Sequence, residues 1–177
     1  MVVSAGSSIT LEEIGSAQPQ LIKWLQLFIF KDRNITLDLA KRAQNSGYKA
    51  LVLTVDQMVL GIRYHNTKNK YEDRYERVNY RPYGVTKDVA LDITWDDIKW
   101  LKQRIQLPLV LKGILTAEDA RLAVESGADA IFVSNHGGRQ LDGSPATVSP
   151  LSISNRFLLT LLQSTVGSTS RSSRRRR

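Results

Sequence analysis

Two stretches of this sequence, LDLAKRAQNSGYKALVLTVD (37–56) and AEDARLAVESGADAIFVSNH (117–136), repeat one pattern. Each starts with alanines at helical spacing, passes through Ser-Gly, and ends in an apolar run followed by polar residues. Gly47 of the first stretch matches Gly127 of the second. All-apolar strands that alternate with helices are typical of a parallel sheet covered on its outer face. The repeat therefore predicts an α/β fold built from helix–strand units.

The rest of the chain continues this alternation. A short apolar start at Val2–Val3 precedes the first predicted helix. Residues 57–92 are polar, rich in tyrosine and irregular, which is typical of a long functional connection. The predicted helices span 7–17, 35–47, 94–105 and 116–127, and the predicted strands span 22–30, 49–56, 107–113 and 128–134.

Capping residues set the expected helix boundaries. Ser8 or Thr10 suits the start of the first helix, and Asn34 or Thr36 suits the start of the second. Gly47 is expected to end that second helix. In the TWDD segment (94–97), the first and last residues predict a capping box in which aspartate takes the place of glutamate.

Polar residues follow the apolar strands at equivalent positions. Asp56, Gly113 and His136 are all expected at the carboxyl edge of the sheet, where ligands of such folds bind. Gln26 lies within its strand, so alternation directs it into a barrel interior or a site. Four or five helix–strand units are too few for an eight-stranded barrel. The sequence leaves open a small α/β sheet or part of a larger barrel.

Composition narrows the class of protein. A chain of 177 residues with 42% hydrophobic and 24% charged residues is typical of a soluble globular domain. The net charge is +8, but five of the arginines lie after residue 170, so the basic character is mostly a tail. No cysteine is present, which excludes disulfides and cysteine-ligated zinc, and two histidines disfavour a histidine-rich metal site. No apolar run long enough for a bilayer and no leader are apparent, so an intracellular protein is expected.

Several segments together resemble a known family. SNHGGRQLD (134–142), combined with the upstream LKG (111–113), resembles the FMN-dependent 2-hydroxy acid oxidases, the family of glycolate oxidase and the long-chain hydroxy acid oxidases. The resemblance covers residues 2–148. It also rests on VSAGSSITLEEI (3–14), WLQLFIFKDRN (24–34), LTVDQMVLGIRYHNTKN (53–69) and LVLKGILTAEDARLAVESGADAI (109–131). It implies that residues 1–148 are part of a parallel (β/α)₈ barrel, about strands 2–6.

The resemblance also implies roles for individual residues. His136 would be the catalytic base, and Asp56 would orient or support it. Arg63 and Arg139 would clamp the substrate carboxylate. The residues that would bind FMN are Ser4, Gln26, Thr54, Lys112 and Ser134, and no metal is implied.

These residue types suit such chemistry. Histidine has an unperturbed pKa of about 6.5 and accepts a proton at neutral pH. A neighbouring carboxylate stabilises the imidazolium that results. Guanidinium groups bind a carboxylate bidentately, and a lysine supplies positive charge where a reduced flavin becomes negative. The paired glycines Gly137 and Gly138 allow a loop to pass close to a cofactor.

Three departures from the family motivate an alternative. Phe28 stands where the family has a tyrosine that contacts substrate. The family's first strand has no counterpart, and the resemblance ends near Val148, before the phosphate-binding segments of the last two strands. Residues 149–177 form a divergent Ser/Arg-rich tail, expected to be disordered or irregular. The alternative is a catalytically impaired or inactive truncated barrel that binds FMN weakly and acts at most as an interaction partner.

The expected partners follow from the resemblance. They are a small 2-hydroxy acid and oxygen, while a homo-oligomer is left open. Tyrosines and arginines interleave over residues 71–83 and the tail is basic, which raises the weaker alternative of a nucleic-acid binder; no nucleic acid and no membrane are expected. The resemblance implies a peroxisomal location, although the final residues are not a peroxisomal signal.

Overall fold

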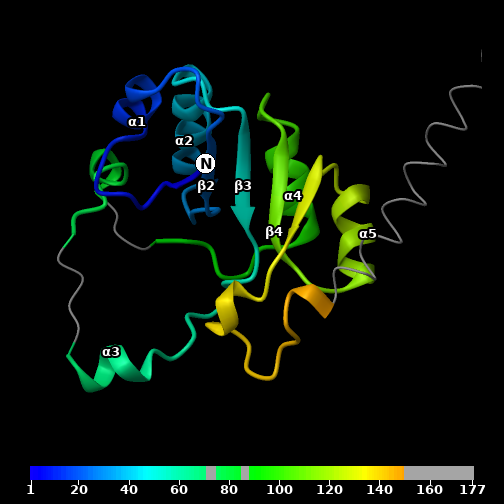
Figure 1. Ribbon diagram of the computed structural model, residues 1–177. Helices are drawn as coiled ribbons and strands as arrows, with labels where there is room; N and C mark the ends of the chain where they lie inside the picture. The colour runs from blue at the N-terminus through cyan, green and yellow to red at the C-terminus, as the bar shows by residue number, and fades with distance from the viewer. Residues whose placement is uncertain (71–74, 85–87, 150–177) are drawn as a thin grey trace, which may run out of the picture.

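The strands form one parallel sheet in chain order. The structure, a computed structural model, describes residues 1–70, 75–84 and 88–149. The sheet order is β1-β2-β3-β4-β5 and all neighbouring strands run parallel, which confirms the predicted parallel sheet (Figure 1). Of the predicted tail, 149–177, residues 150–177 lie outside the described residues. The strands are β1 (Val2–Ser4), β2 (Trp24–Leu27), β3 (Ala50–Thr54), β4 (Leu109–Ile114) and β5 (Ala130–Val133).

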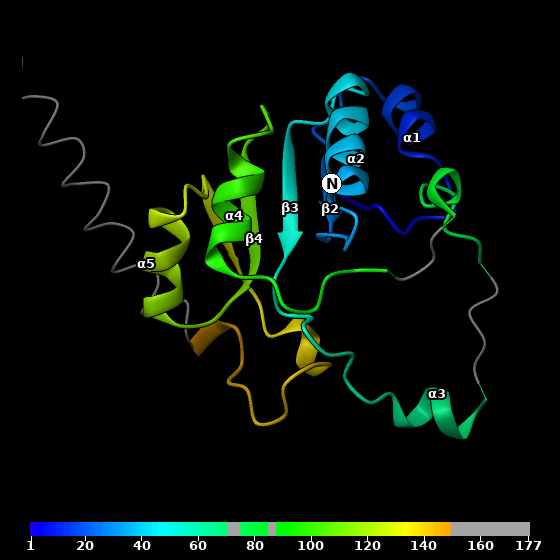
Figure 2. The same cartoon turned by 180° about the vertical axis from the view of Figure 1, so that it is seen from behind.

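Helices connect successive strands. Seen from behind, α2, α4 and α5 lie in front of the sheet, so one face of the sheet is covered by helices (Figure 2). The connection after β3, predicted as irregular, also contains a short helix and a 3₁₀ turn. The helices are α1 (Leu11–Ala17), α2 (Arg33–Asn45), α3 (Tyr64–Lys68), α4 (Trp95–Lys102) and α5 (Ala117–Glu125), with 3₁₀ turns η1 (Arg81–Tyr83) and η2 (His136–Gly138).

Alternation along the strands separates two apolar clusters. The main core, between the sheet and the helices, contains leucines from β2, β3 and β4, all fully buried. The intervening residues Ala50, Val52 and Val110 form a second cluster with Trp24. Because successive side chains of a strand point to opposite faces, this second cluster lies on the face away from the helices. Thr54 and Lys112, which pair in register, continue that row toward the carboxyl edge.

Two predicted helix starts are confirmed. The side chain of Thr10 accepts a hydrogen bond from the N–H of Glu13, whose carboxylate accepts from the N–H of Thr10. Thr94 and Asp97 form the same reciprocal capping box at the start of α4. These contacts satisfy amide groups that the first turn leaves without helical partners.

The predicted cap of α2 is wrong. Asp32 is the N-cap, and its carboxylate accepts from the N–H of Asn34 at 2.9 Å. Thr36 is buried inside the helix, where its hydroxyl accepts from the N–H of Phe30 at 2.9 Å. The hydroxyl of Thr36 thus binds a backbone N–H of the chain that leaves β2, and it does not cap the helix. Gly47, with φ of +79°, ends α2 as predicted.

β2 is shorter than the predicted strand 22–30. Lys23 is buried because its ammonium donates to the carbonyls of Gly15 and Gln18, at 3.0 and 2.6 Å. At the other end, Phe30 leaves the sheet and forms an isolated antiparallel bridge with Val89. A tertiary contact with the long connection therefore ends the parallel pairing early.

Part of the long connection packs onto the body of the domain. Tyr80 is buried and meets Phe30 edge-on, with ring centroids 5.1 Å apart. Arg81 pairs with Glu76, so residues of the tyrosine- and arginine-rich segment make contacts within the protein. In the described part of the chain, no helix has the length and apolar character needed to cross a membrane.

Candidate active site

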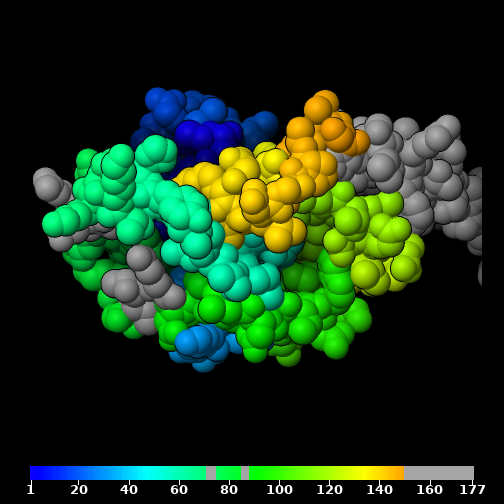
Figure 3. Space-filling view, turned by 90° about the horizontal axis from the view of Figure 1, so that it is seen from below, coloured from blue at the N-terminus to red at the C-terminus, as the bar shows by residue number. Residues whose placement is uncertain are grey.

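The candidate site lies at the carboxyl edge of the sheet. The arrow of β3 points downward in Figure 1, and the loops after β3 and β5 gather at that lower end. Figure 3 views this end directly and shows the segment after β5, in yellow and orange, beside the segment after β3, in cyan and green. The amide of Gln140 joins them by donating to the carbonyl of Val59 at 2.6 Å.

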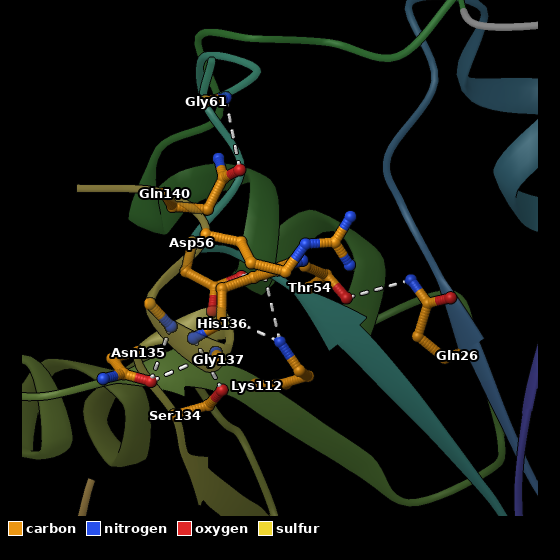
Figure 4. Close-up of polar contacts among 12 residues, drawn as sticks. Gln26, Thr54, Asp56, Gly61, Lys112, Ser134, Asn135, His136, Gly137 and Gln140 are labelled. Carbon is orange, nitrogen blue, oxygen red and sulfur yellow. Dashed lines mark hydrogen bonds and ion pairs between the residues drawn. The ribbon is translucent and has the colours of Figure 1, made fainter. Parts of the chain in front are cut away.

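Asp56, Lys112 and His136 converge at this edge, as the sequence predicts (Figure 4). Nδ1 of His136 lies 2.7 Å from Oδ1 of Asp56. The ammonium of Lys112 lies 3.2 Å from Oδ2 of Asp56 and 3.3 Å from Nδ1 of His136. The Asp56 side chain is only 10% exposed, against 21% for each of the other two. Two cationic or basic groups thus share one shielded carboxylate.

This geometry determines the histidine tautomer. An ionised carboxylate only accepts hydrogen bonds, so the 2.7 Å contact requires the proton of His136 to sit on Nδ1. Nδ1 therefore has no free lone pair to accept from Lys112. The ammonium of Lys112 and Nδ1 of His136 are instead two donors that lie close together because both bind the carboxylate of Asp56. Nε2 of His136 is left as the nitrogen that accepts a proton.

Gly113 allows Asp56 to take this place. A Cβ atom at position 113 would lie 2.4 Å from Cβ and 2.9 Å from the backbone nitrogen of Asp56. Gly113 also has φ of +115°, a conformation that side-chain-bearing residues rarely adopt. Only glycine fits here, so the residue that follows the site lysine positions the carboxylate from the neighbouring strand.

The turn that carries His136 is held by two side chains before it. The hydroxyl of Ser134 accepts from the N–H of His136 at 3.0 Å. Oδ1 of Asn135 accepts from the N–H groups of Gly137 and Gly138, at 3.1 and 3.3 Å. His136 itself has φ of +59°, an uncommon conformation that persists only where the surroundings enforce it. Sequence reasoning missed Asn135, although asparagine before two glycines is a turn signal.

A row of polar side chains crosses the uncovered face of the sheet. The hydroxyl of Ser4 donates to Oε1 of Gln26 at 3.1 Å. The amide nitrogen of Gln26 donates to the hydroxyl of Thr54 at 2.9 Å (Figure 4). These residues come from β1, β2 and β3, and Lys112 of β4 pairs in register with Thr54. Four adjacent strands thus each contribute a polar group.

A cavity of about 820 Å³ adjoins this row. It is lined by nearly all the residues that the sequence assigns to the site, Phe28 among them, whereas Asp56 is not one of its lining residues. Tyr80, Arg77 and Asn66 also line the cavity. None of the three was assigned to the site from the sequence: Arg77 and Tyr80 lie in the interleaved segment 71–83, which raised only the nucleic-acid alternative. The lining residues are Ser4, Gly6, Gln26, Phe28, Thr54, Gln57, Leu60, Arg63, Asn66, Arg77, Tyr80, Lys112, Ser134, His136, Gly137 and Arg139.

The two arginines of the predicted clamp differ in their contacts. Nη1 of Arg63 donates to the carbonyls of Gly61, at 3.0 Å, and of Arg139. Nη2 of Arg63 donates to the side chain of Gln140 at 3.0 Å. In the described part of the chain the guanidinium of Arg139 makes no hydrogen bond or ion pair. Arg63 therefore joins two loops, whereas the cationic group of Arg139 is exposed at the cavity.

The sequence model described as FMN-dependent dehydrogenase matches residues 1–157. The chain belongs to this family. The 2-hydroxyacid oxidase 1 of Mus musculus is 39% identical over 171 residues, a match that covers 85% of this chain and 46% of that protein. A peroxisomal (S)-2-hydroxyacid oxidase of Arabidopsis thaliana is 45% identical over 166 residues, which cover 85% of this chain and 45% of that protein.

The fold likeness agrees with the family match. A Pediococcus acidilactici structure described as a lactate oxidase has a TM-score of 0.85 and 36% identity, covering 89% of this chain and 45% of that one. The chain thus spans about half the length of the relatives that it matches. Its five parallel strands correspond to part of an FMN-dependent TIM barrel, as predicted.

The family's FMN fits the donor set of the cavity. A flavin ring presents carbonyl oxygens and an N–H on one edge, so it needs donors and acceptors side by side. The hydroxyls of Ser4 and Thr54 and the amide of Gln26 supply both kinds of group. The ammonium of Lys112 adds a positive charge next to them.

Proposed function

We propose that this protein is an FMN-dependent 2-hydroxy acid oxidase that converts a 2-hydroxy acid to a 2-oxo acid with oxygen as the electron acceptor. The single observation that carries the proposal is the 2.7 Å contact between Asp56 and His136 beside a cavity lined by Lys112. The similarity to 2-hydroxy acid oxidases supports the same reaction class.

His136 would be the catalytic base. Oxidation of a 2-hydroxy acid removes two electrons and two protons from its hydroxyl-bearing carbon and oxygen. Nε2 of His136 would take one of these protons, because Nδ1 already donates to Asp56. The carboxylate stabilises the imidazolium that forms and keeps the ring oriented, so Asp56 is a positioning residue.

Ser4, Gln26, Thr54, Lys112 and Ser134 would hold the flavin. Bound FMN would accept the two electrons with the remaining proton and pass them to oxygen, which becomes hydrogen peroxide together with the proton that His136 releases. The ammonium of Lys112 would stabilise the negative charge that develops at the cofactor. Its 3.2 Å contact with Asp56 fixes the position of that charge relative to the base.

Arg63 and Arg139 would bind the substrate carboxylate. Arg139 has an exposed guanidinium at the cavity, which suits bidentate binding of a carboxylate. Arg63 contributes while its contacts with Gly61 and Gln140 hold the two loops together. Phe28 would contact the substrate through an apolar ring.

Anaerobic mixing tests this function. The 177-residue chain is saturated with FMN and mixed with glycolate, (S)-lactate or 2-hydroxyoctanoate, and flavin absorbance is followed. We expect bleaching with at least one acid, and hydrogen peroxide on admission of air. His136→Asn should abolish the bleaching while FMN binding persists. FMN binding without bleaching by any of these acids would contradict the proposed activity.

The second candidate is an inactive barrel that serves as an interaction partner. The same mixing experiment separates the two, because an inactive chain leaves the flavin oxidised in the presence of every acid.

We also propose a peroxisomal location, which is supported by the peroxisomal relative. Co-localisation of a tagged chain with a peroxisomal marker is expected, and a diffuse signal would contradict it.

A further inference from the structure

The loop segment 75–84 brings a tyrosine to the cavity from outside the sheet. Asn79 anchors this segment and is fully buried. Its side-chain oxygen accepts from the N–H of Leu11 at 2.9 Å, and its amide donates to the carbonyl of Ile9 at 3.2 Å. Arg42 of α2 donates to the backbone carbonyl of Asn79 at 3.3 Å. The green segment next to α1 in Figure 1 is therefore fixed to two helices.

The next residue, Tyr80, is held by its ring and presents its hydroxyl to the cavity. The ring packs edge-on against Phe30, and the residue is only 4% exposed. In the described part of the chain the hydroxyl has no hydrogen-bond partner, although Tyr80 lines the cavity. Burial raises the pKa of Tyr80 to about 12, so the hydroxyl stays protonated and is a donor at neutral pH.

Gly6 leaves room for one carbon-sized atom beside this hydroxyl, at ordinary van der Waals distances. A Cβ atom at position 6 would lie 3.6 Å from Oη of Tyr80, 3.6 Å from Oγ of Ser4 and 3.8 Å from Cδ of Arg77. A phenol donor, a hydroxyl and an arginine side chain thus surround a point where the protein has no side chain. A small ligand with oxygen atoms fits such surroundings.

Among the described residues, one phenylalanine, Phe28, and one tyrosine, Tyr80, line the cavity. Of these two rings, only that of Tyr80 carries a hydroxyl. We propose that Tyr80 is a substrate-binding residue, whose phenol donates a hydrogen bond to an oxygen atom of the 2-hydroxy acid. This inference rests on the proposed function. It supplies from the loop the phenol that Phe28 lacks.

Binding of pyruvate, a 2-oxo acid, to the FMN-loaded chain tests the inference without turnover. Tyr80→Phe removes the hydroxyl and keeps the ring against Phe30, so the fold should persist. Because a hydrogen bond to a charged group is lost, pyruvate binding, followed by the flavin difference spectrum, should weaken about tenfold. FMN affinity should change less than twofold.

Two further variants separate binding from stability. Tyr48→Phe removes a buried hydroxyl that donates to the carbonyl of Leu11 at 3.1 Å, away from the cavity. It should lower the unfolding midpoint and leave pyruvate binding unchanged. In the Tyr80→Phe background, Phe28→Tyr should restore at least a third of the lost affinity for pyruvate. In the otherwise unchanged chain, Phe28→Tyr should change the affinity for pyruvate less than threefold.

The outcomes are distinct. Pyruvate binding that changes less than threefold in Tyr80→Phe would overturn the role of Tyr80, while bleaching of the unchanged chain by (S)-lactate would keep the proposed function. An unchanged chain that binds FMN but responds to neither pyruvate nor any tested 2-hydroxy acid would overturn both.

Discussion

Asp56 and His136 lie 80 residues apart in the chain, yet Oδ1 of the one is 2.7 Å from Nδ1 of the other. They follow β3 and β5, which do not pair with each other but both pair with β4. Parallel strands place their carboxyl ends at one edge, and Gly113 of β4 leaves the space between them. The contact is therefore a consequence of the parallel topology.

Asp56→Asn should slow flavin reduction strongly. The amide carries no negative charge to stabilise an imidazolium, and it no longer dictates that the proton sits on Nδ1. Reduction by (S)-lactate is expected to fall about 10²- to 10⁴-fold, measured by anaerobic stopped-flow absorbance. Asp96→Asn, at an exposed carboxylate paired with Lys99, is the matched control and should leave the rate unchanged. Equal rates for the two variants would contradict the positioning role of Asp56.

Gly113→Ala should both destabilise the fold and displace the carboxylate. The added Cβ overlaps Asp56 and the backbone has a positive φ, so a loss of at least about 2 kcal/mol is expected in urea unfolding. Gly47→Ala also has positive φ but meets no atom within 4 Å, so its cost should be about 1 kcal/mol. If both variants lost the same stability, the close approach of Asp56 to Gly113 would be wrong.

Asn135→Ala should loosen the turn that carries His136. It leaves the N–H of Gly137 without its acceptor, whereas the N–H of Gly138 keeps the backbone carbonyl of residue 135 at 3.1 Å, so the cost in urea unfolding should be about 1 kcal/mol. Flavin reduction should slow as well, because the turn holds His136 in its uncommon conformation. Asn34→Ala is the control, since that exposed side chain makes no hydrogen bond within the described residues. A reduction rate that Asn135→Ala leaves unchanged would contradict this account.

Glu12→Gln should change the pH dependence of stability. The hydrogen bond from Arg42 lowers the pKa of Glu12 below its usual 4.5, so the folded state favours the ionised carboxylate. The stabilisation is present above pH 4.5 and is lost as the pH falls through the lowered pKa of the folded state. Because this pair is partly exposed, its contribution should be about 1 kcal/mol or less. Urea unfolding from pH 7 to pH 3 should show the two proteins converging in acid, and a constant difference would contradict the assignment.

Local patterns in the sequence predict the parallel sheet and place Asp56, Gly113 and His136 at its carboxyl edge. The helix–glycine–strand repeat and the all-apolar strands predict the parallel sheet, because strands that are buried on both faces of a sheet are apolar at every position. Residues directly after such strands, Asp56 and His136, therefore meet at one edge by topology alone. Thr54 and Lys112 pair in register on neighbouring strands, and their assignment to the site came from the resemblance to the family.

Only the tertiary structure decided the features that depend on contacts between distant segments. Asp32 instead of Asn34 or Thr36 caps α2, since the Thr36 hydroxyl is already bound to the chain leaving β2. Gly113 has a role because the neighbouring strand brings Asp56 against it. Tyr80 reaches the cavity because Asn79 binds the start of α1, 68 residues away in the chain. A periodic pattern reports which face of an element is buried, whereas these positions depend on which partner the folded chain brings to each polar group.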